Sequence, residues 1–141
     1  MPRTDLAKNA AAHRAFVAAR DQGLIRSTDA VTRGGLVVAL TRAAMASELG
    51  VTIEIGTLGG HLGLFAALFS ESTGRLLFTC APGDRAAVER HLGAHHLAAI
   101  GVIAAPQGAT GFLRASRGGK TLFDLDTKTL RKPFSEGLHG V

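Results

Sequence analysis

Short apolar segments with two different periods alternate along this chain, and that alternation most limits the folds open to it. Some segments repeat with the helical period and others with period two, and glycine ends most of them. Residues 51–55, for example, alternate as a half-buried strand directly after Gly50, which ends a helical segment. Helices interleaved with strands around one core predict an α+β fold, an α/β sandwich with one mixed sheet and helices packed on it.

The predicted elements cover most of the chain. The first helix is expected to take Thr4 as its N-cap and to end at Gly23. The last two strands are expected to pair as a hairpin across residues 116–119. Helices are expected over residues 5–22, 34–50, 62–70, 84–92 and 127–138, and strands over residues 24–28, 51–55, 75–80, 97–104, 112–114 and 121–123. The first helix is expected to bury Leu6, Ala10 and Val17 with Phe16 beside them, and the second Leu36, Leu40, Ala43, Ala44 and Ser47.

The composition indicates one globular domain over residues 1–141. Hydrophobic residues make up 46% of the chain and charged residues 19%, a balance typical of folded domains. Because Trp and Tyr are absent, the core has to be built from aliphatic residues, alanine and the 7 Phe. Cys80 is the only cysteine, so no intrachain disulfide can form. The sequence contains neither a secretory signal pattern nor an apolar run that could span a bilayer, so we expect a cytoplasmic protein without a membrane partner.

The net charge of +5 and the pI near 10.4 indicate an anionic partner. Nucleic acid is one candidate, but Lys and Arg are spread from Arg3 to Lys132 instead of forming a stripe. The chain also lacks the interleaved aromatic side chains on which single strands stack. We therefore expect no nucleic-acid partner, and only weak binding to a random duplex at physiological salt. A phosphorylated small molecule accounts for the charge as well.

The most informative segment, residues 29–35, lies between a predicted strand and a predicted helix. Gly34 and Gly35 let the backbone approach a ligand closely, and the free N–H groups of a helix start favour an anion. Arg33 adds a forked cation suited to phosphate, and Thr32 precedes it. A plain strand-to-helix turn that needs glycine for its dihedral angles has the same sequence, so spacing alone leaves both interpretations open.

A second segment, residues 68–75, places Glu71 near the C-terminus of a predicted helix. The helix dipole disfavours a carboxylate there, and a partner such as Arg75 or a metal ion would relieve that cost. The alternative is a solvated Glu71 with an incidental neighbour, which is the commoner arrangement at protein surfaces. Both interpretations stay open at the level of the sequence.

Two further motifs are rejected as sites. Residues 116–121 end like a phosphate-binding P-loop, but Arg114 stands where that pattern requires glycine, and the segment has the pattern of a hairpin. His91, His95 and His96 have metal-like spacing, but a glycine breaks the helix that would align them. We expect neither a metal ligand nor a catalytic residue in this chain.

Three segments in this order resemble one family. They are residues 24–40, which contain DAVTRGGL, residues 68–75, which read LFSESTGR, and residues 100–102, which read IGV. Together they make essentially the whole chain similar to the C-terminal domain of the aminoimidazole ribonucleotide synthetase superfamily. Within that superfamily, the LFSES segment favours phosphoribosylformylglycinamidine synthase of purine biosynthesis.

The resemblance implies the fold of that C-terminal domain and an ATP-dependent ligase activity for the complete enzyme. In this family, ATP with magnesium phosphorylates the amide oxygen of the substrate, and ammonia from glutamine then displaces the phosphate. The complete enzyme pairs an N-terminal ATP-binding domain with a C-terminal domain like this one. The resemblance therefore implies that domain as a partner and ATP and magnesium as cofactors of the whole enzyme. It implies no catalysis and no tight cofactor binding by this chain alone.

The same resemblance implies a set of phosphate- or nucleotide-binding residues. The family's turn reads His-Asp-Val-Ser, one variable residue and Gly-Gly, and this chain has Asp29 and Ala30 in place of the first two residues. Because Ala30 has no oxygen to offer magnesium, the family's metal ligand does not carry over. The residues that the resemblance implies are Thr32, Arg33, Gly34, Gly35, Glu71 and Arg75.

Two functions from different classes follow. The first is the C-terminal domain of a synthase that amidates formylglycinamide ribonucleotide. The second is a non-catalytic module that binds a small anion or another protein on the same fold. Residues 62–69 offer more large apolar side chains than one helix face can bury, so Phe65 and Phe69 lie either in the core or on a contact surface. From the second possibility we expect a homodimer.

Overall fold

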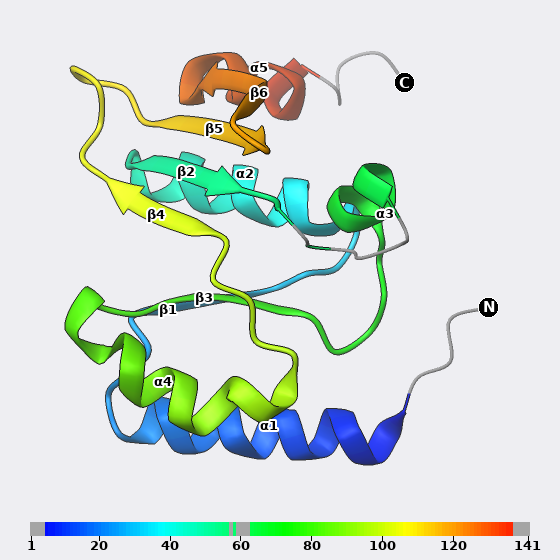
Figure 1. Cartoon of the computed structure of the whole chain (residues 1–141). Coiled ribbons are helices and arrows are strands. Elements are labelled where there is room, and N and C mark those ends of the chain that lie inside the picture. The colour runs from blue at the N-terminus through cyan, green and yellow to red at the C-terminus, as the bar shows by residue number, and fades with distance from the viewer. Residues whose placement is uncertain (1–4, 57, 59–62, 137–141) are drawn as a thin grey trace.

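The computed structural model describes residues 5–56, 58 and 63–136, and these residues form two stacked parts (Figure 1). The upper part in that view holds a four-stranded sheet with three helices, and the lower part holds a two-stranded sheet with two helices. The elements follow in the order α1 (Leu6–Asp21), β1 (Ser27–Ala30), α2 (Gly35–Ser47), β2 (Gly50–Glu54), α3 (Gly63–Phe69), β3 (Leu76–Thr79), η2 (Pro82–Asp84), α4 (Arg85–Leu92), η3 (Gly93–His95), β4 (Gly101–Ala104), β5 (Phe112–Arg117), β6 (Lys120–Asp126) and α5 (Thr127–Glu136).

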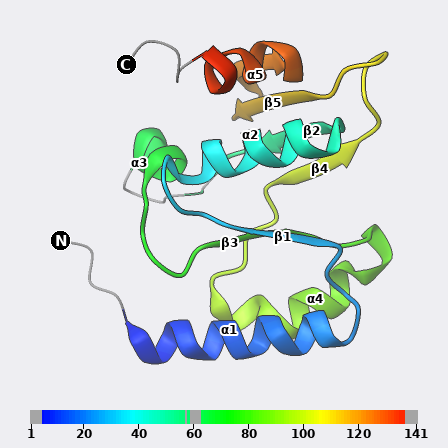
Figure 2. The ribbon, with the colours of Figure 1, turned by 180° about the vertical axis from the view of Figure 1, so that it is seen from behind.

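The larger sheet is mixed and has the strand order β4-β2-β5-β6. Its central strands β2 and β5 run parallel, whereas β4 and β6 run antiparallel to their neighbours. Helix α2 covers one face of this sheet, as the view from behind shows (Figure 2). Ile53 of β2 and Leu113 of β5 are buried in one cluster with Leu36 and Leu40 of α2, which forms the main core.

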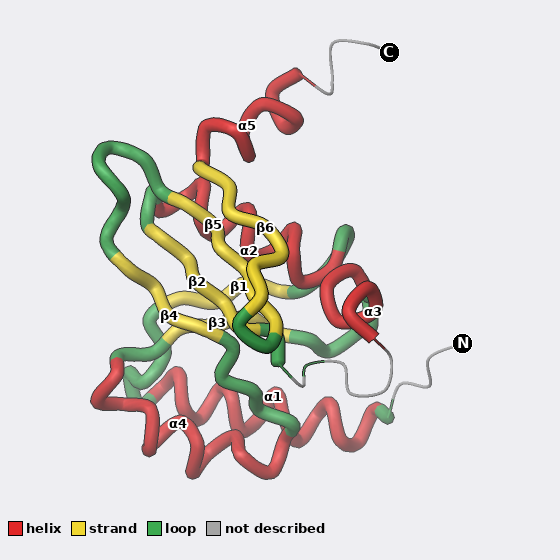
Figure 3. Tube along the Cα trace, turned by 45° about the horizontal axis from the view of Figure 1, so that its top comes forward, coloured by secondary structure: helices red, strands yellow, loops and turns green. Residues whose placement is uncertain are grey.

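The smaller sheet pairs β1 with β3 in antiparallel register. Helices α1 and α4 lie side by side beneath it (Figure 3). Phe16 of α1 is buried with Val88 and Leu92 of α4, and its ring centroid lies 5.5 Å from that of Phe78 in β3. The lower part therefore has a small core of its own.

The predicted α+β class with a mixed sheet and packed helices is confirmed. The structure adds that β1 and β3 form a separate sheet, because a period-two pattern indicates a strand but does not specify its partner. β1 also begins at Ser27 instead of residue 24, since the N–H groups of Gly23 and Leu24 donate to Arg20 and Ala19 and close the end of α1. No helix among the described residues is long and apolar enough to cross a membrane.

The buried face of α1 differs from the prediction. Leu6, Ala10 and Val17 are exposed, and Phe16 and Ala19 are the buried residues. The helix is so rich in alanine that several of its faces are similarly apolar, so periodicity could not identify the face that turns toward α4.

Helix α1 is capped one residue after the predicted N-cap. The N-cap of α1 is Asp5, whose side chain accepts the N–H of Lys8 at 3.0 Å, and this bond lowers the pKa of Asp5. The predicted N-cap Thr4 lies outside the described residues. So do Leu62, where the third helix was predicted to begin, and Leu138, where the last helix was predicted to end.

The predicted face of α2 is largely confirmed. Leu36, Leu40 and Ala44 are buried, and Ala43 is half-buried. Ser47 is instead exposed, and its hydroxyl donates to the Ala43 carbonyl at 2.9 Å, as serine near a helix end commonly does.

Candidate functional site

An open cavity of about 390 Å³ lies where the turn between β1 and α2 meets the segment that enters β3. The two segments singled out in the sequence, residues 29–35 and 68–75, thus meet at one place although they are far apart in the chain. Four of the six predicted site residues line this cavity directly, and Gly34 and Gly35 follow in the turn behind it. The lining residues are His13, Ala30, Val31, Thr32, Arg33, Glu71, Thr73, Gly74, Arg75 and Leu76.

The two glycines of the turn are required by its geometry. Gly34 and Gly35 have φ of 80° and 70°, in the left-handed region that other residues rarely adopt. A Cβ on Gly35 would lie 2.6 Å from the carbonyl oxygen of Leu68 and 2.6 Å from the carbonyl carbon of Phe69. Gly35 therefore lets the start of α2 pack against the backbone at the end of α3.

Glu71 is bound to the turn from across the cavity. Its Oε1 accepts the N–H of Gly34 at 2.8 Å. This N–H lies at the start of α2, where the helix dipole favours a negative charge. Glu71, which lies unfavourably after the C-terminus of α3, is thus stabilised by the N-terminus of α2.

Arg75 holds the end of α3 and does not pair with Glu71. Its guanidinium donates to the carbonyl and hydroxyl oxygens of Ser70 at 2.9 and 3.0 Å, and to the carbonyl oxygen of Ala67 at 3.1 Å. No ion pair joins it to Glu71, so the pairing considered from the sequence is wrong, because helix-end carbonyls take its donors instead. Burial lowers the pKa of the half-buried Arg75 below its ordinary value.

Thr32 and Arg33 present their side chains at the rim of the cavity. Both residues are exposed, and in the part of the chain that the structure describes no carboxylate pairs with the Arg33 guanidinium. The fork of Arg33 is therefore available for a bidentate contact with an anion.

His13 is a lining residue that the sequence analysis missed. It is an exposed residue of α1 in the lower part of the molecule. The packing of α1 brings it there, since a Cβ on Gly74 would lie 2.5 Å from the side-chain nitrogen of Asn9. No local signal marks His13, because its position depends on a contact between segments far apart in the chain.

The cavity does not fit a magnesium ion. Asp29 is tied to Arg42 at 2.9 Å, and Ala30 offers no side-chain oxygen. Glu71 is the one carboxylate among the lining residues, and its Oε1 already accepts a hydrogen bond. Within the described residues no group of three or more His, Cys, Asp or Glu side chains could hold a metal ion.

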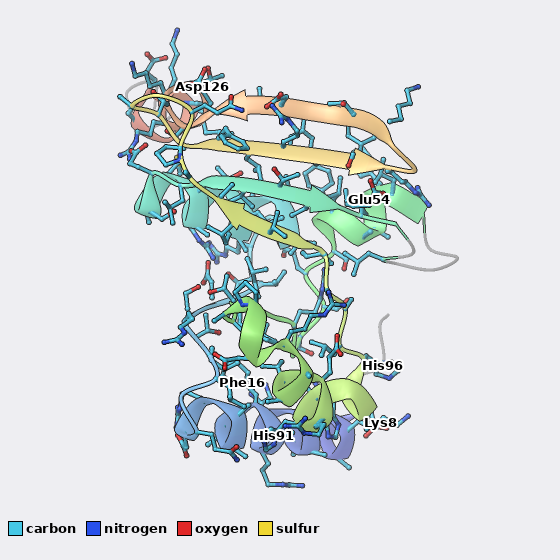
Figure 4. All side chains as sticks on the ribbon, turned by 60° about the vertical axis from the view of Figure 1, so that its left-hand side comes forward. Lys8, Phe16, Glu54, His91, His96 and Asp126 are labelled. Atoms are coloured by element: carbon cyan, nitrogen blue, oxygen red, sulfur yellow. The ribbon has the colours of Figure 1, made fainter. Side chains whose placement is uncertain are left out.

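Glu54, at the end of β2, has a structural role at the β5–β6 hairpin that the sequence did not indicate (Figure 4). It accepts the Ser116 hydroxyl at 2.7 Å and the Gly118 N–H at 2.8 Å, and these bonds hold its pKa below the ordinary value. Residues 116–121, which end like a P-loop in sequence, thus belong to a hairpin whose turn is held by the Glu54 carboxylate. His91 of the rejected histidine group lies beside Gln22, with 3.1 Å between its Nε2 and the amide oxygen.

An apolar patch, which we call the α3 patch, consists of Phe65 and Phe69. Phe65 is 78% exposed and Phe69 is 44% exposed, and their ring centroids lie 4.9 Å apart. The possibility that both side chains lie in the core is therefore wrong. Two adjacent exposed aromatic rings are typical of a contact surface.

Comparison with known proteins identifies relatives over most of the chain. The family described as "AIR synthase related protein, C-terminal domain" matches residues 3–114. The chain is 31% identical over 119 residues to the phosphoribosylformylglycinamidine synthase subunit PurL of Synechocystis sp., and 32% identical over 139 residues to that of Salinibacter ruber. These alignments cover 83% and 97% of this chain but 15% and 18% of the relatives, so the chain spans less than a fifth of their length.

Solved structures give the same fold. The chain matches Thermotoga maritima PurL complexed with FGAR with a TM-score of 0.77 at 15% identity, over 90% of this chain and 21% of that one. It matches the same enzyme complexed with ATP with a TM-score of 0.68 at 16% identity, over 85% of this chain and 21% of that one. The resemblance recognised in the three sequence segments is thereby confirmed.

Proposed function

The chain belongs to the family of AIR synthase related C-terminal domains, and from this membership we propose that it is the C-terminal domain of a phosphoribosylformylglycinamidine synthase. The complete enzyme would amidate formylglycinamide ribonucleotide in purine biosynthesis, with residues 1–141 as one of its domains. With this place in purine biosynthesis we also propose a cytoplasmic location. The observation that supports the proposal best is the meeting of residues 29–35 and 68–75 at one cavity.

The proposed role of this cavity is to bind a phosphate group of the substrate or of ATP. The guanidinium of Arg33 and the hydroxyl of Thr32 would contact the phosphate oxygens, while Gly34 and Gly35 shape the turn behind them. The Glu71 carboxylate already accepts the Gly34 N–H at 2.8 Å, so the phosphate would bind at the rim and not on the helix start itself. Structures of Thermotoga maritima PurL with FGAR and with ATP fit a phosphate-bearing ligand.

The two remaining residues of the predicted set have supporting roles in this proposal. Arg75 fixes the end of α3 through the carbonyls of Ser70 and Ala67. Glu71 fixes the turn through Gly34. Magnesium, which the family uses with ATP, would be held by other parts of the complete enzyme, because the lining residues do not fit it.

The proposed partner is the ATP-binding domain of the same enzyme. The α3 patch is the surface that supports this, since Phe65 is 78% exposed in the chain alone. A solved assembly of a relative, PurLQS from Thermotoga maritima, fits a protein that works with further subunits. For the chain without its partner domain we propose a homodimer.

A titration with inorganic phosphate and with ATP tests the cavity. Replacing Arg33→Gln is expected to weaken binding about tenfold, because one charge-assisted contact is lost. Arg117→Gln is the matched control, since Arg117 is also an exposed arginine and lies on the β5–β6 hairpin, and it should leave the affinity unchanged. Equal affinities of the two variants would refute a phosphate role for Arg33.

The same preparation also tests the proposal that the chain is not catalytic alone. We expect no ATP hydrolysis and no formylglycinamidine ribonucleotide from the purified 141-residue chain. Steady-state turnover that Gly35→Asp abolishes would contradict this expectation.

A further inference from the structure

One side of the cavity is formed by a helix that the proposed function does not use. The other sides come from residues 29–35 and 68–75, the two segments of the family's motif. Helix α1 of the lower part adds His13. The segment between α3 and β3 reaches down toward α1 at this place (Figure 1). A ligand in the cavity therefore meets side chains from both stacked parts of the molecule.

The position of His13 follows from the contact of α1 with Gly74. A Cβ on Gly74 would lie 2.5 Å from the side-chain nitrogen of Asn9, so the two residues touch closely, and the φ of 85° at Gly74 favours glycine there. His13 follows Asn9 by four residues, and side chains at this spacing share one side of a helix. The contact thus places the exposed His13 at the cavity.

The charged groups that face His13 belong to the other sides of the cavity. They are the guanidinium groups of Arg33 and Arg75 and the carboxylate of Glu71. The helical neighbours of His13, three and four residues away, carry no charge; they are Asn9, Ala10, Phe16 and Val17. The charged and titratable residues of α4 and η3, which also pack on α1, do not line the cavity; they are Arg85, Glu89, Arg90, His91 and His95.

The charges of the lining residues determine which anion suits the cavity. Arg33 and Arg75 carry two positive charges and Glu71 carries one negative charge, so one positive charge is left while His13 is neutral. Protonation of His13 raises this balance to two positive charges. A terminal phosphate ester carries close to two negative charges near neutral pH, whereas a phosphodiester carries one. The doubly charged group is therefore matched only when His13 is protonated.

We propose that His13 is a second anion contact of this cavity, and that its protonated imidazole selects a doubly charged terminal phosphate group. This role rests on the proposed function, in which Arg33 and Thr32 bind phosphate oxygens at the rim. An imidazolium donates from both ring nitrogens, so α1 adds a charge-assisted hydrogen bond from the opposite side. Histidine changes its charge between pH 5 and pH 8, where arginine and carboxylate charges stay constant. Binding of a dianion should accordingly tighten as the pH falls through this range.

Titration of the full chain with sulfate, followed by NMR chemical shifts, tests the role of His13. Sulfate keeps two negative charges at pH 6 and at pH 8, so any pH dependence of its binding comes from the protein. The parent chain is expected to bind sulfate about fivefold more tightly at pH 6 than at pH 8. His13→Gln keeps a polar side chain without the charge and should bind equally at both pH values. Because His13 is exposed, the variant should keep the spectrum of the folded parent chain.

Methyl phosphate and dimethyl phosphate at pH 7 test the selection between phosphate groups. The two probes differ by one methyl group and by about one charge. The parent chain is expected to prefer methyl phosphate, and His13→Gln should lose about fivefold of that preference, as expected for one exposed charge contact. An unchanged preference in His13→Gln would overturn the selection.

His95→Gln is the matched control, because it removes another histidine next to α1 that does not line the cavity. It should keep the pH dependence of the parent chain. The proposal is overturned if the parent chain binds sulfate equally at both pH values, or if His95→Gln removes the pH dependence and His13→Gln does not.

Arg33→Gln separates the role of His13 from the proposed function. This variant should bind sulfate more weakly at both pH values and keep the pH dependence, since His13 is still present. Sulfate binding by Arg33→Gln that equals that of the parent chain would refute the proposed function. Weaker binding by Arg33→Gln, together with the parent's pH dependence in His13→Gln, would refute the role of His13 alone.

Discussion

The wall and the rim of the cavity contain residues of two kinds. In the wall, by which we mean Glu71, Arg75 and the turn residue Gly35 directly behind the cavity, each residue is engaged by backbone contacts or hydrogen bonds within the chain. At the rim, Arg33 and His13 are exposed side chains. The wall residues are those that match the family's motif, whereas Arg33 occupies the position that varies in it. The motif therefore describes how the turn is built more than what the turn binds.

The difference predicts two kinds of response to substitution. A change in the wall should lower the free energy of unfolding, because packed backbone or buried donors lose their partners. A change at the rim should leave that free energy nearly unchanged and act on ligand affinity alone. The variants below test this division, beginning with the largest expected loss of stability.

Gly35→Ala is expected to give the largest loss, about 3 kcal/mol in the free energy of unfolding. A left-handed backbone costs a non-glycine residue about 1–2 kcal/mol, and a methyl group forced against packed atoms adds a similar amount. The packed atoms are the backbone at the end of α3, 2.6 Å from the new Cβ, which cannot rotate away. Urea denaturation of the purified variant measures this loss.

Two other glycines separate the cost of the left-handed backbone from the cost of the steric contact. Gly23 has φ of 73° and no atom near its missing Cβ, so Gly23→Ala should lose only about 1 kcal/mol. Gly93 has an ordinary helical φ of −57° and no atom near its missing Cβ, so Gly93→Ala should be neutral or slightly stabilising. If Gly35→Ala costs no more than Gly23→Ala, the wall is not close-packed at this turn.

Arg75→Met is expected to cost less, about 2 kcal/mol. The methionine keeps most of the apolar stem but removes the donors to Ser70 and Ala67, and their carbonyls then have to turn to water. Arg75→Lys should recover part of this loss, since one ammonium reaches fewer acceptors than the guanidinium fork. Arg33→Met is the matched rim variant, and its free energy of unfolding, measured in urea, should stay within about 0.5 kcal/mol of that of the parent chain. Equal losses at Arg33 and Arg75 would remove the distinction between rim and wall.

Local sequence patterns predicted most elements of the fold but not the relations between them. Residues 51–55 and 84–92 form β2 and α4 with shifts of one residue at the ends, because strand alternation and helix-ending glycines act locally. The separation of β1 and β3 into their own sheet was not predictable, since their partner choice depends on the packing of α1 and α4 beneath them. The face of α1 was missed for a related reason, because an alanine-rich helix has no dominant apolar stripe.

The resemblance grouped Thr32, Arg33, Glu71 and Arg75 into one candidate set, and these four residues line one cavity, while their binding of a ligand stays a prediction. The partner of each side chain was not predictable. Arg75 is near Glu71 in sequence but turns to the carbonyls of α3, and Glu71 bonds to the distant Gly34. Such choices depend on which donors and acceptors the tertiary fold leaves unpaired.

Among the wall variants, Glu71→Gln is expected to have the smallest effect on stability, and it is expected to strengthen phosphate binding, the opposite of the effect of Arg33→Gln. The amide oxygen can still accept the Gly34 N–H, so only the charge-assisted part of that bond is lost, less than about 1 kcal/mol. Removing a negative charge from a cavity that also holds Arg33 should strengthen phosphate binding several-fold. Glu89→Gln is the matched control, because it removes the same charge from the exposed pair with Arg85 on α4 and should leave phosphate affinity unchanged.

Thermal denaturation and titration with phosphate, then with ATP and magnesium, measure the two effects of Glu71→Gln side by side. A residue that only supports the turn should give tighter phosphate binding with or without magnesium. If Glu71 instead contributes its free oxygen to a metal that accompanies the nucleotide, the variant should bind ATP more weakly only when magnesium is present. That result would move Glu71 from the wall to the binding residues, and Arg33 would no longer be the principal contact of the cavity with its ligand.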